Sequence, residues 1–505
     1  MERKWWTLLA VCLATFMLLV DVTIVNVALP SIQSDLDASL TSLQWVVDAY
    51  ALTLAALLLT AGTLADRFGR RRIFLIGVTI FTAASFACGI ATSATFLNLA
   101  RAVQGIGGAA MFATSLALIA QEFTGRERGT AIAAWGSTVG LAVAIGPLVG
   151  GALTEALSWP WIFYVNLPIG IFTVVLGRAR MAEYANPEAG RIDIPGLVTF
   201  SAGLFLGVFG LLRGNAEGWG STLIVSSLTV SVVLLTLFVL VERRAPRPMF
   251  DLSLFSKPAF AGVSIATVAI GAGMFAMFLY LSLYLQDILG YSPLQAGLRF
   301  LPLSAMVFVV PLLTRNLGTR VPPRVMLGMG LLLVSVGLLL MHGISVTSGW
   351  TTLLAGFIVA GVGIGLSNPA IGAIALAVVE PARSGMASGI NNTCRLGGVA
   401  IGIAALGAIF QSRISSSLAD SLHNPQSGLG GTVASSGTRA VGHLVPATDR
   451  VQAVAAARHA FVVGLNDILL VGSGILLFGA IVAFTLIRAS DFQPVPGPAP
   501  SEAKA

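Results

Sequence analysis

Long runs of apolar residues, separated by short polar connectors, make up most of this chain. Most runs have about 20 residues, the length at which an α-helix crosses the hydrocarbon core of a bilayer. The pattern therefore predicts an all-α, multi-pass membrane protein with fourteen spans. These are expected at 7–29, 44–65, 72–92, 97–119, 130–153, 160–180, 194–213, 220–241, 259–286, 294–315, 321–343, 350–373, 386–410 and 461–488.

Composition and charge agree with a membrane protein. The 505 residues are 56% hydrophobic, with a mean hydropathy of +0.89, a balance that soluble domains do not carry. The net charge of +7 does not indicate nucleic acid, because the basic residues lie in connectors rather than in one patch. An even span count puts both termini on one side. The arginine-rich connectors predict that this side is the cytoplasm. Arg far outnumbers Lys, and Ala and Gly are abundant, a bias that suggests a bacterial source and therefore a bacterial inner membrane.

The most charged connector, GTLADRFGRRR at Gly62–Arg72, joins the second and third spans. Positive connectors stay on the cytoplasmic side, so its charge alone indicates only an anchor. Its glycines allow close helix approach and a tight turn, and its aspartate can pair with an arginine or with a helix end. The ordered residues resemble the signature loop of the major facilitator superfamily: Gly62, Asp66, Arg67, Gly69 and Arg70.

Two further segments resemble motifs of that family. The fourth span opens on RAVQGIGGA at Arg101 and matches the family's Arg-x-x-Gln-Gly-x-Gly-x-Ala pattern, including Gln104 and Gly105. The fifth span carries a Gly-Pro-x-x-Gly-Gly order that resembles a motif of exporters in this superfamily. Ordinary small-residue packing is the alternative. Its residues are Gly146, Pro147, Gly150 and Gly151.

Asp21 lies inside the first span, where a carboxylate costs about 2.5–3.5 kcal/mol on insertion scales. It is therefore expected to face a cavity or a partner, unless it only breaks the helix near its outer end. Arg101 either reaches the interface or pairs with a carboxylate. The resemblance implies that both residues serve proton coupling. A changing distance between them would change how readily the carboxyl group holds a proton.

Other residues are candidates for the substrate site. Asp48, with the aromatic Trp45 and Tyr50, could attract an organic cation, or could be an exposed interfacial carboxylate. The same two readings apply to Asp287. Met274 and Phe278 could line an adaptable apolar cavity, although ordinary helix packing is the favoured explanation for them. Three polar residues share one side of the thirteenth span, which carries no carboxylate: Asn391, Asn392 and Arg395.

The resemblance also implies an architecture. The second half echoes the first, since Gly361-Val-Gly363 repeats Gly105-Ile-Gly107 at the same relative place. Spans seven and eight have no counterpart, as in the drug:proton antiporters with fourteen spanners. The expected organisation is a six-helix bundle at 1–180, an inserted helix pair with linkers at 181–257, and a second six-helix bundle at 258–490. A long external loop at 411–460 and a disordered cytoplasmic tail at 491–505 complete it.

The implied function is proton-coupled efflux of an amphipathic compound, expected to be a cationic drug or an antibiotic, by alternating access. Proton-driven uptake and a receptor or scaffold role are the alternatives. The sequence has no Walker-type loop and no metal-ligand spacing, so we expect no enzyme activity, no metal and no cofactor besides the proton gradient. The expected partners of the monomer are a small molecule, protons and the bilayer.

Overall fold

A computed structural model describes residues 2–38, 40–184, 193–244, 252–314, 321–379, 384–421, 433 and 450–488 of this chain. Every regular element in these ranges is helical, which confirms the all-α prediction. The expected tail at 491–505 and part of the expected loop at 411–460 lie outside the described residues.

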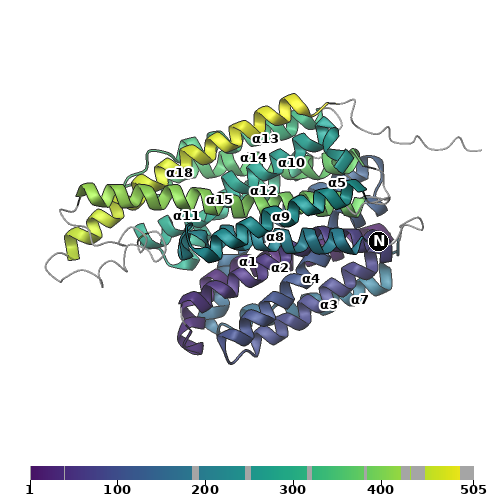
Figure 1. The fold of residues 1–505 in the computed structure, drawn as a ribbon, viewed down its shortest axis with the longest axis horizontal. Helices are drawn as coiled ribbons and strands as arrows, with labels where there is room; N and C mark the ends of the chain where they lie inside the picture. Colours follow the sequence, from purple (N-terminus) through teal and green to yellow (C-terminus); the bar gives the residue numbers. More distant parts are fainter. Residues whose placement is uncertain are drawn as a thin grey trace, which may run out of the picture.

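Seven helices make up the N-terminal half in the described residues up to Arg180. Most of them lie together in the lower part of Figure 1, where α3 and α4 pack side by side and α1 and α2 lie next to them. Their bounds are α1 Arg3–Leu36, α2 Leu40–Phe68, α3 Arg70–Gly89, α4 Ala94–Glu122, α5 Gly125–Ala156, α6 Trp161–Tyr164 and α7 Asn166–Arg180.

The C-terminal half occupies the upper part of Figure 1, where α18, α13, α14 and α10 lie together. The expected ninth span is one rod interrupted by two π-helical turns, η2 and η3. The bounds are η1 Leu252–Ser256, α10 Pro258–Ile270, η2 Gly271–Phe275, α11 Met277–Leu283, η3 Tyr284–Ile288, α12 Pro293–Thr314, α13 Pro323–Met341, η5 Trp350–Leu353, α14 Leu354–Ala377, α15 Ser384–Ser421 and α18 Arg450–Leu486.

The two halves meet along two seams. At one seam α5 packs against α12, and at the other α2 packs against α15. The additional pair, α8 (Ile194–Glu217) and α9 (Thr222–Arg244), lies between the halves in Figure 1. Helix α8 contacts both α2 and α15, so it lies along the second seam. Thr60 of α2 shares a 3.0 Å hydrogen bond with Ser201 of α8 there.

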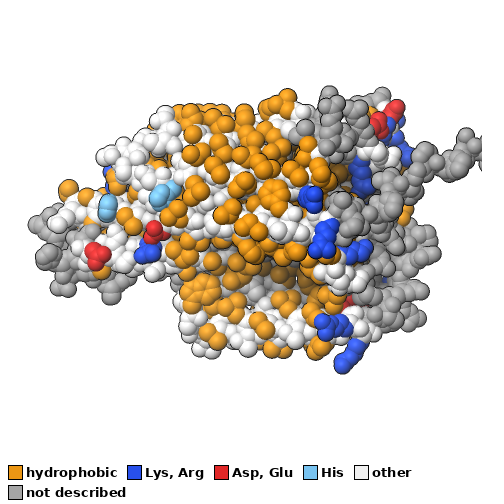
Figure 2. All heavy atoms as spheres, turned by 90° about the horizontal axis from the view of Figure 1, so that it is seen from above, with side chains coloured by type: hydrophobic (Ala, Val, Ile, Leu, Met, Phe, Trp, Pro, Cys, Tyr) orange, Lys and Arg blue, Asp and Glu red, His pale blue; other side chains and the backbone are white. Residues whose placement is uncertain are grey.

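Among the described residues, thirteen helices are long and apolar enough to cross a membrane. Helix α5, with 32 residues, packs between α1 and α12 in addition to these, so the arrangement is compatible with the fourteen expected spans. Figure 2 shows a broad apolar belt around the middle, and most visible Lys and Arg side chains gather at the end where the chain begins. This distribution fits a protein that is embedded in a bilayer.

Helices α15 and α18 are longer than the spans expected from hydropathy. They have 38 and 37 residues and project together beyond the other helices at the left of Figure 1. Arg413 and Asp467 join them through a 2.9 Å ion pair between Nε and Oδ2. Both ends of the expected external loop at 411–460 are therefore helical. Apolar side chains such as Ile414, Leu418 and Ala457 bury one face of each helix and favour its continuation.

Gly105 allows α4 to approach α2 closely. A Cβ atom built at this residue would lie 2.5 Å from the backbone oxygen of Tyr50 and 2.1 Å from Oγ1 of Thr53. We expect Gly105→Ala to lower the free energy of unfolding by about 1–3 kcal/mol through overpacking. Thermal unfolding in detergent measures this. Gly397→Ala is the matched control, because no atom of the described residues lies within 4 Å of its built Cβ. Equal melting temperatures for the two variants would contradict the prediction.

Candidate functional site

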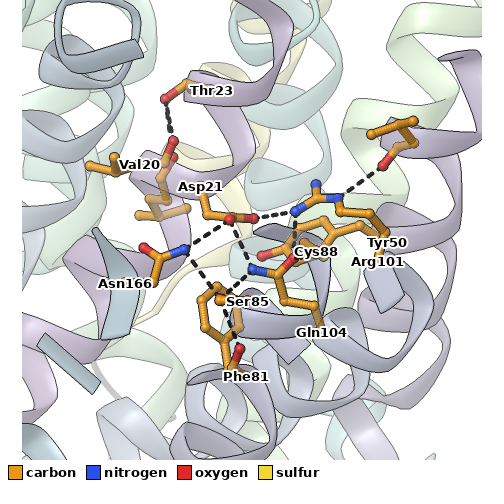
Figure 3. Close-up of polar contacts among 12 residues, drawn as sticks. Val20, Asp21, Thr23, Tyr50, Phe81, Ser85, Cys88, Arg101, Gln104 and Asn166 are labelled. Atoms are coloured by element: carbon orange, nitrogen blue, oxygen red, sulfur yellow. Dashed lines mark hydrogen bonds and ion pairs between the residues drawn. The ribbon is translucent and has the colours of Figure 1, made fainter. Parts of the chain in front are cut away.

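Asp21 is the centre of a polar cluster inside the N-terminal half (Figure 3). Its side chain is fully buried, although α1 crosses the apolar belt. Nη1 of Arg101, from α4, donates to its Oδ2 at 2.5 Å. Its Oδ1 accepts from Nε2 of Gln104 at 2.9 Å and from Nδ2 of Asn166 at 3.1 Å. Three donors thus stabilise a carboxylate that has no contact with water in this conformation.

Arg101 has further polar contacts besides its ion pair with Asp21. Its Nε donates to the backbone oxygen of Val46 at 2.9 Å, and its Nη1 also reaches Oε1 of Gln104 at 2.7 Å. The guanidinium lies 4.2 Å from the ring centre of Tyr50, at a distance suited to a cation–π contact. Arg101 is 1% exposed, so it points into the bundle rather than to the interface.

Two members of the cluster, Asn166 and Ser85, were not predicted from the sequence. Asn166 opens α7, and Ser85 of α3 accepts from Gln104 at 2.8 Å while donating to the backbone oxygen of Phe81. Both are polar residues inside apolar runs, and this was the only indication of a site in the sequence. Whether their side chains point toward Asp21 depends on how α3 and α7 pack against α1. Gln104 was expected to belong only to a conformational motif, and its direct contact with Asp21 adds it to the site.

The glycine motif of α5 packs against the turn that carries Asp21. A Cβ at Gly146 would lie 1.7 Å from Oγ1 of Thr23, and one at Gly150 would lie 2.9 Å from the backbone oxygen of Ile24. Gly151 faces Leu294 of α12, in the other half. Pro147 lies in the same helix, and its side chain is outside the described residues. Movement of α5 against α1 would therefore act directly on the backbone around Asp21.

The charged connector joins the two halves. Asp66 Oδ1 accepts from Nε of Arg70 at 2.9 Å, and its Oδ2 accepts from the backbone nitrogen of Met386 at 3.0 Å. Met386 lies in the first turn of α15, where backbone donors lack partners within the helix and a negative charge is favoured. Gly69 makes the turn with φ of +108°, while Gly62 and Arg67 lie in the last turns of α2.

We expect Asp66→Ala to loosen this contact between the halves. A hydrogen bond to a charged group contributes about 1.5–3 kcal/mol. Its loss should raise, by about tenfold or more, the ratio of molecules in which α2 and α15 have separated at this end to molecules in which they remain in contact. Spin labels at Arg72 and Arg324, both exposed on opposite halves, would report a longer distance in a background without Cys12, Cys88 and Cys394. Glu155→Ala, which removes an exposed carboxylate, is the control. An unchanged distance distribution in Asp66→Ala would oppose the prediction.

The residues expected to attract a cation do not form one group. Tyr50 is 2% exposed and lies against Arg101. Asp48 faces the additional helix pair, with its Oδ2 3.8 Å from Nη1 of Arg213 in α8. Trp45 stacks on Phe209 of α8, with 5.9 Å between ring centres. Asp287 is half-buried in η3, toward one end of the ninth span.

A small cavity, largely apolar, lies where both halves meet. Val139 and Gly140 of α5 line it from the N-terminal half. Phe278 lines it from the other half, whereas Met274 is fully buried in the core of that half. The remaining lining residues are Phe275, Leu303, Ser304, Val307, Ile364 and Asn368.

The polar residues of the thirteenth span are buried in α15. Asn391 donates to Oγ1 of Thr267 in α10 at 3.1 Å, and Nδ2 of Asn392 lies 3.5 Å from the backbone oxygen of Phe112 in α4. Arg395, one turn further along, is 5% exposed. The contact between Asn392 and Phe112 shows that this side of α15 faces the N-terminal half.

Comparison with known proteins agrees with this geometry. The family model described as Major Facilitator Superfamily matches residues 11–403. The chain is 38% identical over 414 residues to the multidrug resistance protein Stp of Mycobacterium tuberculosis, covering 82% of this chain and 77% of that protein. It is 33% identical over 493 residues to the multidrug efflux pump LfrA of Mycolicibacterium smegmatis, covering 96% and 97%.

A solved structure shares the fold. The crystal structure of the human organic anion transporter MFSD10 aligns with a TM-score of 0.63 at 12% identity, over 96% of this chain and all of that one. At this identity the likeness concerns the fold alone. The match to the family model and the two bacterial relatives show that this chain belongs to the major facilitator superfamily and is related to its multidrug resistance transporters.

Proposed function

We propose that this protein is a proton-coupled exporter of amphipathic small molecules in a bacterial inner membrane, with both termini in the cytoplasm. The observation that carries the proposal is the buried cluster of Asp21, Arg101 and Gln104. A carboxylate inside a membrane protein is costly and marks a functional site. Its contacts join α1 to α4 and α7, so relative movement of these helices changes the number of donors around it.

The coupling step follows from these contacts. In the described conformation the carboxyl group of Asp21 is fully buried and accepts hydrogen bonds from three donors. Separation of α1 from α4 would take Arg101 and Gln104 away from Asp21, and we infer that the carboxyl group exchanges its proton in that state. Because α5 packs on α1 beside Asp21, rocking of the halves at the seam between α5 and α12 can drive this separation.

Export is supported by two further observations. The order of Gly146, Pro147, Gly150 and Gly151 resembles the exporter motif, and Gly146 and Gly150 lie against α1. The related proteins Stp and LfrA are named for multidrug resistance and efflux. The charge of the transported compound does not follow from Asp48, because Arg213 pairs with that carboxylate.

Everted membrane vesicles test the direction of coupling. With an acidic lumen, an antiporter accumulates its substrate while protons leave, whereas a symporter does not. Two probes on the same xanthene scaffold, cationic rhodamine 123 and anionic fluorescein, cover both charges. Accumulation of either dye that an uncoupler abolishes supports antiport. Proton-driven expulsion from preloaded vesicles would favour the uptake alternative, and no movement of either dye would favour a receptor or scaffold.

A further inference from the structure

Arg395 differs from the other buried arginines of the membrane belt. Its Nε and Nη2 atoms are buried without a hydrogen-bond partner, and no described carboxylate lies within 4 Å of its guanidinium. Arg101 and Arg213, by contrast, both pair with carboxylates. A buried cation without a counter-charge is costly, so its place in the fold requires an explanation.

The side chain of Arg395 belongs to the face of α15 that lies toward the N-terminal half. Ser388 and Asn392 precede it by seven and three residues, so all three lie on one side of the helix. Asn392 contacts the backbone oxygen of Phe112 in the opposite half. Oγ of Ser388 and Oδ1 of Asn392 are also buried, with no hydrogen-bond partner in the part of the chain that the structure describes. This face therefore presents a cation, a hydroxyl group and an amide at the junction of the halves.

A second unpartnered polar group lies at similar depth. Asn368 of α14 is 1% exposed and lines the cavity between the halves, and its Oδ1 and Nδ2 atoms have no hydrogen-bond partner among the described residues. It lies about 14 Å along the axis from the end of α14, and Arg395 lies about 17 Å from the start of α15. Both residues are thus near the middle of the belt, where a transporter of this architecture holds its substrate.

We propose that Arg395 binds an anionic group of the transported compound, such as a carboxylate or a phenolate, and that the substrate is an amphipathic anion or zwitterion. A guanidinium offers paired donors that match a carboxylate. Ser388 and Asn392 supply hydrogen bonds to polar groups beside the charge. The inference rests on the proposed export function and replaces the cationic substrate expected from the sequence.

Binding to the purified full-length chain in nanodiscs tests this proposal directly. Fluorescein and rhodamine 123 are titrated and followed by fluorescence anisotropy, which requires no transport. Wild type is expected to bind fluorescein more tightly than rhodamine 123. Arg395→Gln should weaken fluorescein binding by about tenfold or more, because a charge-assisted hydrogen bond is lost, and should not weaken rhodamine 123 binding. Arg395→Lys should retain part of the affinity for fluorescein.

Two controls separate binding from folding. Arg324→Gln removes one exposed positive charge from the same half and should leave both affinities unchanged. Without a dye, Arg395→Gln should melt no lower than wild type, since it removes an uncompensated buried charge. A lower melting temperature together with equal loss of both dyes would indicate a structural arginine and overturn the proposal.

The remaining outcomes are also decisive. Failure of wild type to bind fluorescein, or unchanged fluorescein affinity in Arg395→Gln, overturns the inference while leaving proton-driven transport of rhodamine 123 possible. Fluorescein binding that depends on Arg395, without any proton-driven movement in vesicles, would instead support the anion site and reject the export function.

Discussion

Asp21→Asn is expected to abolish dye accumulation driven by a pH gradient in everted vesicles. Asparagine has nearly the same shape and can still accept from Gln104 and Asn166, but it cannot carry a proton. Exchange of labelled for unlabelled dye across the membrane, which needs no net proton movement, should remain measurable. Initial rates of both processes in proteoliposomes separate a loss of coupling from a loss of folding.

The control for this experiment is Glu155→Gln, which neutralises an exposed carboxylate in the same half. We expect this variant to retain both processes. Gradient-driven accumulation by Asp21→Asn at a rate close to that of wild type would exclude Asp21 as the proton carrier. Loss of both accumulation and exchange would point to a structural role for the cluster, because exchange requires only the alternating movement.

Arg101→Gln should have the largest effect on stability. The substitution leaves the buried Asp21 carboxylate without its cation and removes the contacts to Val46 and Tyr50. Breaking a buried pair from one side costs about 3–5 kcal/mol. Combining Arg101→Gln with Asp21→Asn should cost less than the two single changes together, because neither partner then retains an uncompensated charge.

Denaturant unfolding of the four proteins in detergent measures the coupling between the two residues. Arg324→Gln, on the surface of the C-terminal half, should leave the free energy of unfolding nearly unchanged. Additive losses in the double variant would mean that the Asp21–Arg101 pair contributes little beyond its separate contacts, and the mechanism proposed for proton release would lose its basis.

The positions of the spans could be predicted from the sequence, because the hydrocarbon core requires apolar helical segments and charged residues stay in the connectors between them. An inward direction for Asp21 could also be expected, since a charge in a span must find a partner. The contacts of Asn166 and Ser85 could not, because small rotations of α7 and α3 decide whether these side chains meet Asp21 or another helix.

The surroundings of Asp48 illustrate the same limit. Its carboxyl group, with two aromatic residues nearby in the sequence, was consistent with a cation site. The structure pairs it with Arg213, 165 positions later in the chain, because α8 packs against α2. Pairing at such separation depends on where an additional helix lies, and a single sequence does not contain that information. The helical ends at 411–421 and 450–460 depend likewise on α15 and α18 supporting each other.

The position of α8 gives the two seams different access from the lipid bilayer. Helix α8 lies along the seam between α2 and α15, and its contacts reach both helices. A hydrophobic compound dissolved in the bilayer would have to displace α8 to enter between α2 and α15. Among the described helices, the seam between α5 and α12 has no such cover from the additional pair. A substrate would therefore enter from the membrane mainly at the seam between α5 and α12. Substitutions that widen this seam would change the rate of entry most.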